Sequence, residues 1–331
     1  MTVQRTSWRM FLAATLAMLV GSGGGCPAED WEPLEPTRGD EPRVQLGLRL
    51  KPGVSFTEST ELQFAHEEHI GQEKMRQDQT LRFELRYQVR EVDENGHTVL
   101  DVAFHRVAGR IRFDPTAESY AFDSAEPDRS DEALRPMLAL IGPQLKMRIG
   151  GDGSIERIEG LSAARQAVLD AGADLESKDR GLLEQVLDGL LAPQRLHRGF
   201  ELIGHLPQEP VGSDARWARQ VHRQRPIPLD IEYRFRLRSL REERVRIDIE
   251  GRALSRGEPV EIGDDVEIRA AVQGRSDGEM VIDRATGLIR RARLRDQMEG
   301  DAFYPDPQGT SLTGRMVIEG ETSVSMRLDE P

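Results

Sequence analysis

The sequence His66-Glu67-Glu68-His69 is the one place in this chain where metal-binding and acid–base side chains cluster. A helical zinc-protease motif needs two histidines four residues apart with a glutamate between them, so that both imidazoles share one face. Here the histidines are three residues apart, in a segment that reads as strand or polar turn. In a strand, positions i and i+3 point to opposite faces. The spacing therefore predicts a solvated turn and no metal site.

Other candidates for catalysis are scattered along the chain. His105, His197, His205 and His222 show no repeating spacing to a partner, and no Gly-x-Ser-x-Gly elbow is present. The run Gly150-Gly151-Asp152-Gly153 reads as a hairpin turn, since no Lys-Ser/Thr and helix follow it. The 58 acidic residues make accidental carboxylate neighbours unavoidable. We predict a non-enzymatic protein without cofactor. An acid-dependent hydrolase is an alternative that would require a cleft with two carboxylates and a raised pKa.

The first 26 residues read as an export signal. Arg5 and Arg9 form a charged n-region, and the apolar run Met10 to Val20 is far shorter than the ~20 residues that span a bilayer. Small residues then lead to Cys26, the only cysteine. A cysteine in this position resembles the acylation site of bacterial lipoproteins, although Gly23 stands where an aliphatic residue is usual. We predict a signal peptide over 1–25 and lipidation of Cys26, with secretion as a soluble protein as the alternative.

Composition limits the partners and the stabilising forces. The formal net charge is −13, from 45 basic and 58 acidic residues, which argues against nucleic acid and anionic membrane surfaces. A single cysteine allows no internal disulfide. Residues 27–42 are rich in proline and acid and have few apolar side chains, which predicts a flexible tether over 26–43.

Beyond the tether, apolar and polar residues alternate with a period of two, which is typical of strands with one buried face. A hairpin is predicted over Leu81–Val107 with its turn at Asn95-Gly96, and a second over Ile231–Ile249. Further strands are predicted over Val44–Leu50, 56–64, 70–75, 111–113, 145–149, 155–158, 266–272, 280–282, 288–294 and 316–328, with a strand end at Tyr120–Ser124 and a loop at Asp301–Ser311. The fold class is mainly β: one continuous or two related antiparallel sheets of hairpins.

Helices are predicted near 130–142 and over 162–192. The second region contains a helix after Ser162 and then a leucine-rich stripe at helical spacing. The stripe is either core packed on the sheet or a movable, ligand-facing lid over an apolar cavity; its residues are Leu182, Leu183, Val186, Leu187, Leu190 and Leu191. Prolines between 204 and 228 suggest a boundary, which divides one domain into β-rich halves at 44–200 and 201–331.

An internal repeat is suggested by two pairs of similar segments. Residues 85–90 match 231–236, and the segment from Met147 to Leu161 resembles the one from Met280 to Leu294. The spacings differ, so a true duplication and a chance likeness of amphipathic hairpins both stay open.

The order of these features resembles an uncharacterised family of bacterial envelope lipoproteins known only as a domain of unknown function. The likeness covers about residues 44–329 and lies in Leu48–Gly53, the Leu85–Phe104 hairpin, Tyr120–Ser124, Gly153-Ser154-Ile155 with Glu159-Gly160-Leu161, and Gly278 with Gly287-Leu288. The resemblance implies a β-rich exported lipoprotein and no known activity. A more distant architectural likeness is to periplasmic lipid and lipoprotein carriers, in which a curved sheet encloses an apolar cavity.

These observations predict a non-enzymatic protein of the bacterial cell envelope, anchored to a membrane through lipid on Cys26 and facing the periplasm or the outer membrane. The anchor signal, the tether and the one-sided sheet favour binding of an apolar ligand or of another envelope protein. The alternative is a structural or assembly factor with a dry core that recognises a partner by a sheet edge.

Overall fold

The structure is a computed structural model that describes residues 43–192, 196–223, 227–262, 266–305 and 311–329. The predicted signal peptide, Cys26 and nearly all of the predicted tether lie outside the described residues. Among the helices within these ranges, none combines the length and the hydrophobicity needed to cross a membrane.

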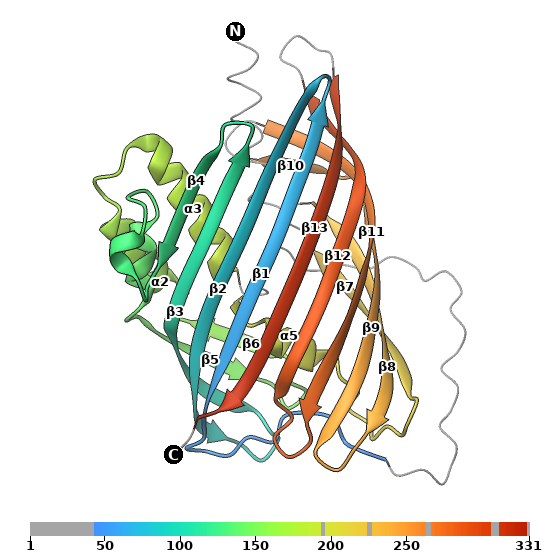
Figure 1. Cartoon of the computed structure of the whole chain (residues 1–331). Coiled ribbons are helices and arrows are strands. Elements are labelled where there is room, and N and C mark those ends of the chain that lie inside the picture. Colours follow the sequence, from blue (N-terminus) through green and yellow to red (C-terminus); the bar gives the residue numbers. More distant parts are fainter. Residues whose placement is uncertain (1–42, 193–195, 224–226, 263–265, 306–310, 330–331) are drawn as a thin grey trace.

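The described residues form one antiparallel sheet of thirteen strands, which confirms the mainly β fold class (Figure 1). Along the sheet the order is β6-β5-β3-β2-β1-β13-β12-β11-β9-β8-β7, while β4 pairs with β3 and β10 pairs with β11. The strands are β1 Ser55–Ile70, β2 Glu73–Val92, β3 Thr98–Asp114, β4 Glu118–Asp123, β5 Gln144–Ile149, β6 Ile155–Glu159, β7 Arg216–Arg223, β8 Leu229–Leu240, β9 Arg244–Ser255, β10 Pro259–Ile262, β11 Val266–Asp283, β12 Ile289–Pro305 and β13 Ser311–Leu328.

The two predicted hairpins are confirmed as β2–β3 and β8–β9. In β2 the odd-numbered residues Leu81, Phe83 and Leu85 are buried, and the charged residues between them face the other side. Gly96 lies in the β2–β3 turn with a φ of 81°, which its missing Cβ allows at low cost. Both strands are longer than predicted, because β2 begins before Leu81, at Glu73, and β3 continues after Val107 to Asp114.

The two halves have the same strand order. Strands β1-β2-β3-β5-β6 follow one another as neighbours, with the short β4 inserted after the third; β7-β8-β9-β11-β12 do the same, with the short β10 inserted after the third. The repeat-like segments 85–90 and 231–236 fall on β2 and β8, which are second in each series. Strand β13 joins the halves by pairing with β1 on one side and β12 on the other.

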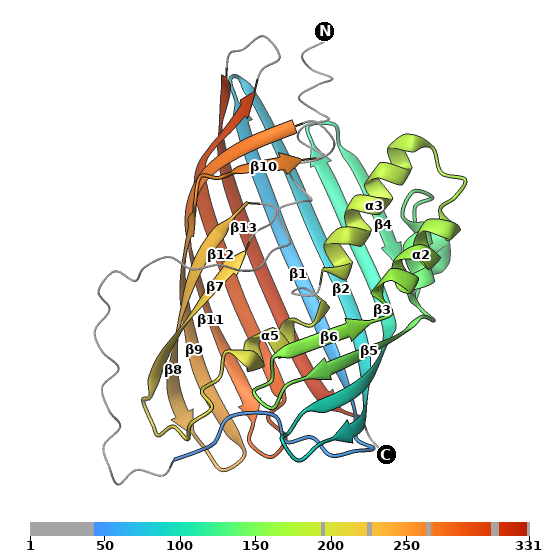
Figure 2. The ribbon, with the colours of Figure 1, turned by 180° about the vertical axis from the view of Figure 1, so that it is seen from behind.

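Three α-helices in the described ranges lie on the inner side of the curved sheet (Figure 2). They are α2 Leu161–Ala171, α3 Ser177–Leu191 and α5 Arg198–Gly204. Helix α2 begins after Gly160, whose φ is 92°, and Ser162 does not cap it. The helix predicted near 130–142 is instead a pair of short 3₁₀ segments, Pro127–Arg129 and Arg135–Leu140, each with proline in its first turn. Helix α5 was not predicted.

Several strand boundaries differ from the prediction. The segment Val44–Leu50 forms only an isolated bridge between Val44 and Val211, although Val44, Leu46 and Leu50 are buried. The strands predicted over 266–272 and 280–282 are one strand, β11, and β12 continues through Asp301 to Pro305, where a loop was predicted. In β11 and β12, pairing with a long neighbouring strand extends the ladder through residues of weak β propensity.

One hydrophobic core runs through both halves. It includes the buried stripe of α3, apolar residues of α5 such as Phe200, and inward side chains from both halves of the sheet. In the stripe, Leu183, Val186, Leu187 and Leu190 are 0% exposed, while Leu182 and Leu191 are below a tenth. The stripe therefore packs as core in this structure.

Candidate functional site

The inner face of the sheet carries buried polar side chains among its apolar ones, and these are the candidate functional residues. On β1 they are Glu58, Thr60, His66 and Glu68, and on β2 they are Gln77, Gln79 and Tyr87. They share the phase of the apolar residues on the same strands, so the ordinary alternation turns them inward. Two groups result, one near each end of β1.

The first group surrounds Glu58, a carboxyl with no exposed surface. The hydroxyl of Tyr87 donates to Oε2 over 2.9 Å, and the backbone N–H of Gly199 donates to Oε1 over 2.9 Å. The Thr60 hydroxyl lies 3.3 Å from Oε1. The Tyr87 hydroxyl also lies within hydrogen-bonding distance of Nδ1 of His197, at 2.9 Å. These bonds join β1, β2 and the start of α5.

Close packing holds this group in position. The rings of Phe56 and Tyr87 stack 4.8 Å apart at 6°, and Phe200 of α5 meets Tyr87 edge-on at 5.3 Å. A Cβ on Gly199 would lie 2.3 Å from Cε of Met326 and 3.1 Å from Oε1 of Glu58, so a side chain there would have to displace both groups. We interpret the Glu58 group as the latch that fixes α5 to the inner face.

Burial sets the protonation of the latch. Burial raises the pKa of Glu58 to about 7, and the bonds from Gly199, Tyr87 and Thr60 offset only part of the effect. Burial lowers the pKa of His197 to about 3, so its imidazole is neutral at neutral pH. Glu58 can therefore gain or lose a proton near neutrality.

The second group lies at the far end of β1 and corrects the solvated turn predicted for residues 66–69. These residues belong to β1, and the side chains of His66 and Glu68 are 0% exposed. Glu67 and His69 face outward, where Glu67 pairs with His69 and Lys74 at 2.7 and 2.8 Å. The two histidines lie on opposite faces, as a strand requires. In the described part of the chain, no group of three or more metal-ligating residues is positioned to hold a metal ion.

Glu58 and Glu68 both have a raised pKa, which bears on the hydrolase alternative. Burial raises the pKa of Glu68 to about 8. The two carboxyls lie ten residues apart on one strand, or about 33 Å at the usual rise per residue. They are too far apart to act as an acid–base pair across one bond, for which carboxyl separations are below about 10 Å.

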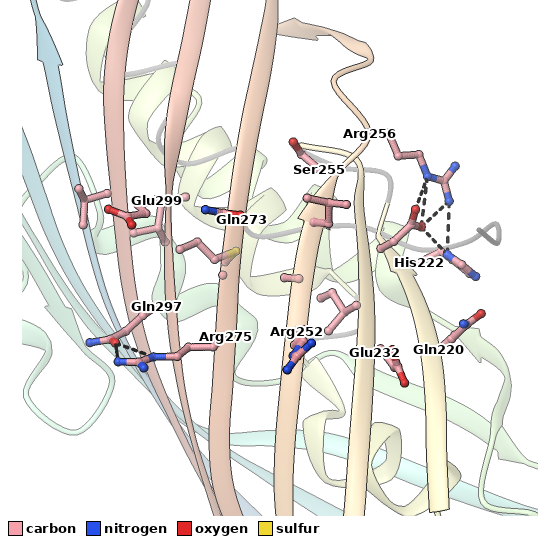
Figure 3. Close-up of a pocket in the computed structure, with 18 of the residues that line it drawn as sticks. Gln220, His222, Glu232, Arg252, Ser255, Arg256, Gln273, Arg275, Gln297 and Glu299 are labelled. Carbon is pink, nitrogen blue, oxygen red and sulfur yellow. Dashed lines mark hydrogen bonds and ion pairs between the residues drawn. The ribbon is translucent and has the colours of Figure 1, made fainter. Parts of the chain in front are cut away.

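On the outer face, an open hollow of about 1450 Å³ lies over strands β7 to β13 (Figure 3). Its most compact polar cluster joins three neighbouring elements: Asp230 Oδ1 lies 2.6 Å from both His222 Nδ1 and Arg256 Nη2. The Arg256 and His222 contacts lower the pKa of Asp230. Leu254, 61% exposed, lies in the same hollow. Asp230 and Arg256 thus pair with each other at the surface, where ion pairs contribute little to stability.

The sequence-predicted residues have different outcomes. Cys26 lies outside the described residues, and the leucine-rich stripe is in the core. The histidines regarded as scattered do find partners through the fold: His197 joins Tyr87 and His222 joins Asp230. Sequence reasoning missed Glu58 and Tyr87. A usable signal exists in the phase of β1, where Glu58, His66 and Glu68 occupy positions that should be apolar.

The chain belongs to a family of unknown function (DUF6263), whose profile matches residues 95–289. The prediction of an uncharacterised family is thus confirmed, while export and lipidation stay predictions. A search of curated protein sequences gives no significant match.

Among solved structures, the chain is similar to one titled "Lipid-protein interactions in lipovitellin", at 9% identity and a TM-score of 0.43. That match covers 85% of this chain and 26% of the other, so the chain spans about a quarter of its length. A weaker likeness, with a TM-score of 0.22 and 6% identity over 96% of both chains, is to the transport unit of the autotransporter AIDA-I from Escherichia coli. At these scores neither likeness carries an argument for this chain.

Proposed function

We propose that this chain is a non-enzymatic, lipid-anchored protein of the bacterial cell envelope that binds an amphipathic molecule on the inner face of its curved sheet. The anchor rests on the sequence around Cys26. The binding role rests on one observation about the described residues, which is the incomplete apolar lining in the middle of that inner face.

The middle of the inner face is mostly apolar but not closed, and Asp296, bonded to Ser276, is the charged residue beside it. Leu62, Phe64 and Met298 point inward from β1 and β12 and pack on the core, yet each is only partly buried. Gly320 of β13 stands among them in place of a side chain, and nothing lies within 3.7 Å of where its Cβ would be. Exposed apolar surface on an inward-curving face is costly in water and favours a ligand with an apolar portion.

Binding can be tested with an environment-sensitive alkyl probe titrated into the full chain, purified free of detergent. We expect saturable binding at up to one probe per chain. Gly320→Leu should reduce that binding about tenfold or more by filling the inner face. Glu319→Leu, one residue away on the outer face, is the matched control and should bind as the parent does.

Two results would contradict the binding role. One is indifference of the parent protein to every alkyl probe, and the other is equal binding by Gly320→Leu. A reproducible protein partner without any bound amphiphile would instead favour an assembly factor that pairs through a sheet edge.

The anchor has its own test. Cys26→Ala removes the thiol that would carry the lipid, so the protein should move from the membrane fraction to the soluble fraction while its far-UV circular dichroism stays unchanged. Radiolabelled palmitate should enter the parent and not the variant. Retention of Cys26→Ala in the membrane fraction would contradict lipid anchoring.

A further inference from the structure

Four polar side chains lie together on the inner face of the sheet, where the C-terminal end of β1 pairs with the beginning of β2. His66 lies directly opposite Gln77 in the ladder, Glu68 lies opposite Met75, and Gln79 lies opposite Phe64. His66, Glu68 and Gln77 are 0% exposed, and Gln79 is 4% exposed. Four such residues on one buried face form a compact polar patch.

The surroundings of this patch are apolar. On β13, Ile318 faces His66 and Met316 faces Glu68, while on β3 Phe113 faces Gln77 and Ile111 faces Gln79. These four neighbours are almost fully buried. Gly314 of β13 adds no side chain, and its missing Cβ would lie 3.4 Å from Oε1 of Glu68. The patch is thus a polar island in an otherwise apolar wall.

Three of the four side chains have unused hydrogen-bonding capacity. Both carboxyl oxygens of Glu68, and both amide atoms of Gln77 and of Gln79, are buried without a hydrogen-bond partner among the described residues. Buried polar groups in native proteins are nearly always paired, and each unpaired one destabilises the fold. A cluster of six such atoms on adjacent strands indicates that a bound molecule satisfies them.

The electrostatics of the patch select the kind of molecule. Burial keeps Glu68 protonated at neutral pH, with a pKa of about 8, and keeps His66 neutral, with a pKa of about 3. The nearby charges of Glu67, Lys74 and Arg76 lie on the outer face and pair with one another. The patch therefore offers a carboxylic acid and two carboxamides, which donate and accept hydrogen bonds and carry no net charge.

We propose that Glu68, Gln77 and Gln79 bind the uncharged polar head of an amphipathic ligand, through the hydroxyl, ester or amide groups of a neutral acyl lipid. This inference rests on the proposed function, because the apolar middle of the inner face supplies the place for the acyl chain. A fatty acid would bring a carboxylate to a site without a cation, and an amine would require Glu68 to ionise.

The test compares three ligands of equal chain length: a monoacylglycerol, a fatty acid and an alkylamine. Each competes with the alkyl probe on the full chain, and the monoacylglycerol should bind at least about tenfold more tightly than the other two. Glu68→Leu and Gln77→Leu should each weaken monoacylglycerol binding about tenfold and leave the alkyl probe unaffected. Glu68→Gln keeps a neutral hydrogen-bonding group and should bind like the parent.

Folding of the variants is not an obstacle. Leucine in place of a buried, unpaired polar group removes a desolvation cost, so Glu68→Leu and Gln77→Leu should unfold at the parent temperature or above it. Gln63→Leu, on the outer face of β1, is the matched control and should leave head-group selectivity unchanged.

The outcomes separate the two proposals. If the alkyl probe binds and the three head groups are not distinguished, the head-group site is wrong and the binding role stands. Tight amine binding that is lost in Glu68→Gln would overturn the neutral-head assignment. If no amphiphile binds, both proposals fail.

Discussion

Replacing Glu58 with glutamine should make the protein's stability much less dependent on pH between about 4.5 and 7. In the folded state burial raises the pKa of Glu58 from 4.5 to about 7. Below 4.5 both states are protonated and the full stability is present. As pH rises, the unfolded chain releases its proton while the folded chain keeps it, so the free energy of unfolding falls by about 1.4 kcal/mol per pH unit.

The loss through Glu58 reaches about 3 kcal/mol at neutral pH and then levels off. Glutamine can still accept the N–H of Gly199 and donate to Tyr87, and it has no proton to release. The difference in unfolding free energy between Glu58→Gln and the parent should therefore shift in the variant's favour by about 3 kcal/mol between pH 4 and pH 7. Urea titrations followed by far-UV circular dichroism at each pH measure this difference.

Glu61, on the outer face of β1, provides a control in which the pH dependence of stability should have the opposite sign. Bonds from Arg82 and Gln63 lower the pKa of Glu61, so this residue contributes stability above its unfolded pKa and loses it as pH falls. Glu61→Gln should therefore be destabilising at neutral pH and less so in acid. Parallel pH profiles for Glu58→Gln and the parent would show that Glu58 does not carry a raised pKa.

Truncation of Leu187 to alanine should destabilise the protein by about 2–5 kcal/mol. Leu187 is 0% exposed at the centre of the α3 stripe, and the surrounding core comes from several elements that cannot all close the cavity. For a domain of this size, each kcal/mol lowers the melting temperature by roughly 2–4 °C. Leu254→Ala on the outer face, where the side chain is 61% exposed, should change the melting temperature very little.

The same variant separates a core helix from a movable lid. If α3 opens independently of the sheet, Leu187→Ala should cost less than about 1 kcal/mol of global stability. The backbone amides of α3 would then exchange with solvent deuterium faster than those of β2. Exchange of α3 together with β2, and a large loss of stability, are the results that the core packing predicts.

For the polar residues of the inner face, the sequence predicts which side of the strand they occupy but not that they are buried. Their phase in β1 is readable, since Glu58, His66 and Glu68 occupy the same parity as Phe56 and Phe64. Their burial is not readable, because an alternating strand with polar residues at inward positions looks like a solvated segment. For this reason the local pattern at residues 66–69 predicts a turn.

The latch required information that no local pattern contains. His197 lies 110 residues from Tyr87, and Gly199 lies 141 residues from Glu58. Helix α5 spans only Arg198–Gly204, too short for a helical period to stand out, and such a short helix is stable only through its packing.

What the sequence by itself determined is the two-residue alternation, the hairpins β2–β3 and β8–β9, and the apolar stripe of α3, because each depends on contacts between near neighbours in the chain. The tertiary structure decided that β1 pairs with β13, that the two halves share one core, and that α5 is fixed to Glu58. These arrangements join residues far apart in the chain, and they depend on which buried surfaces fit together, which the local pattern does not specify.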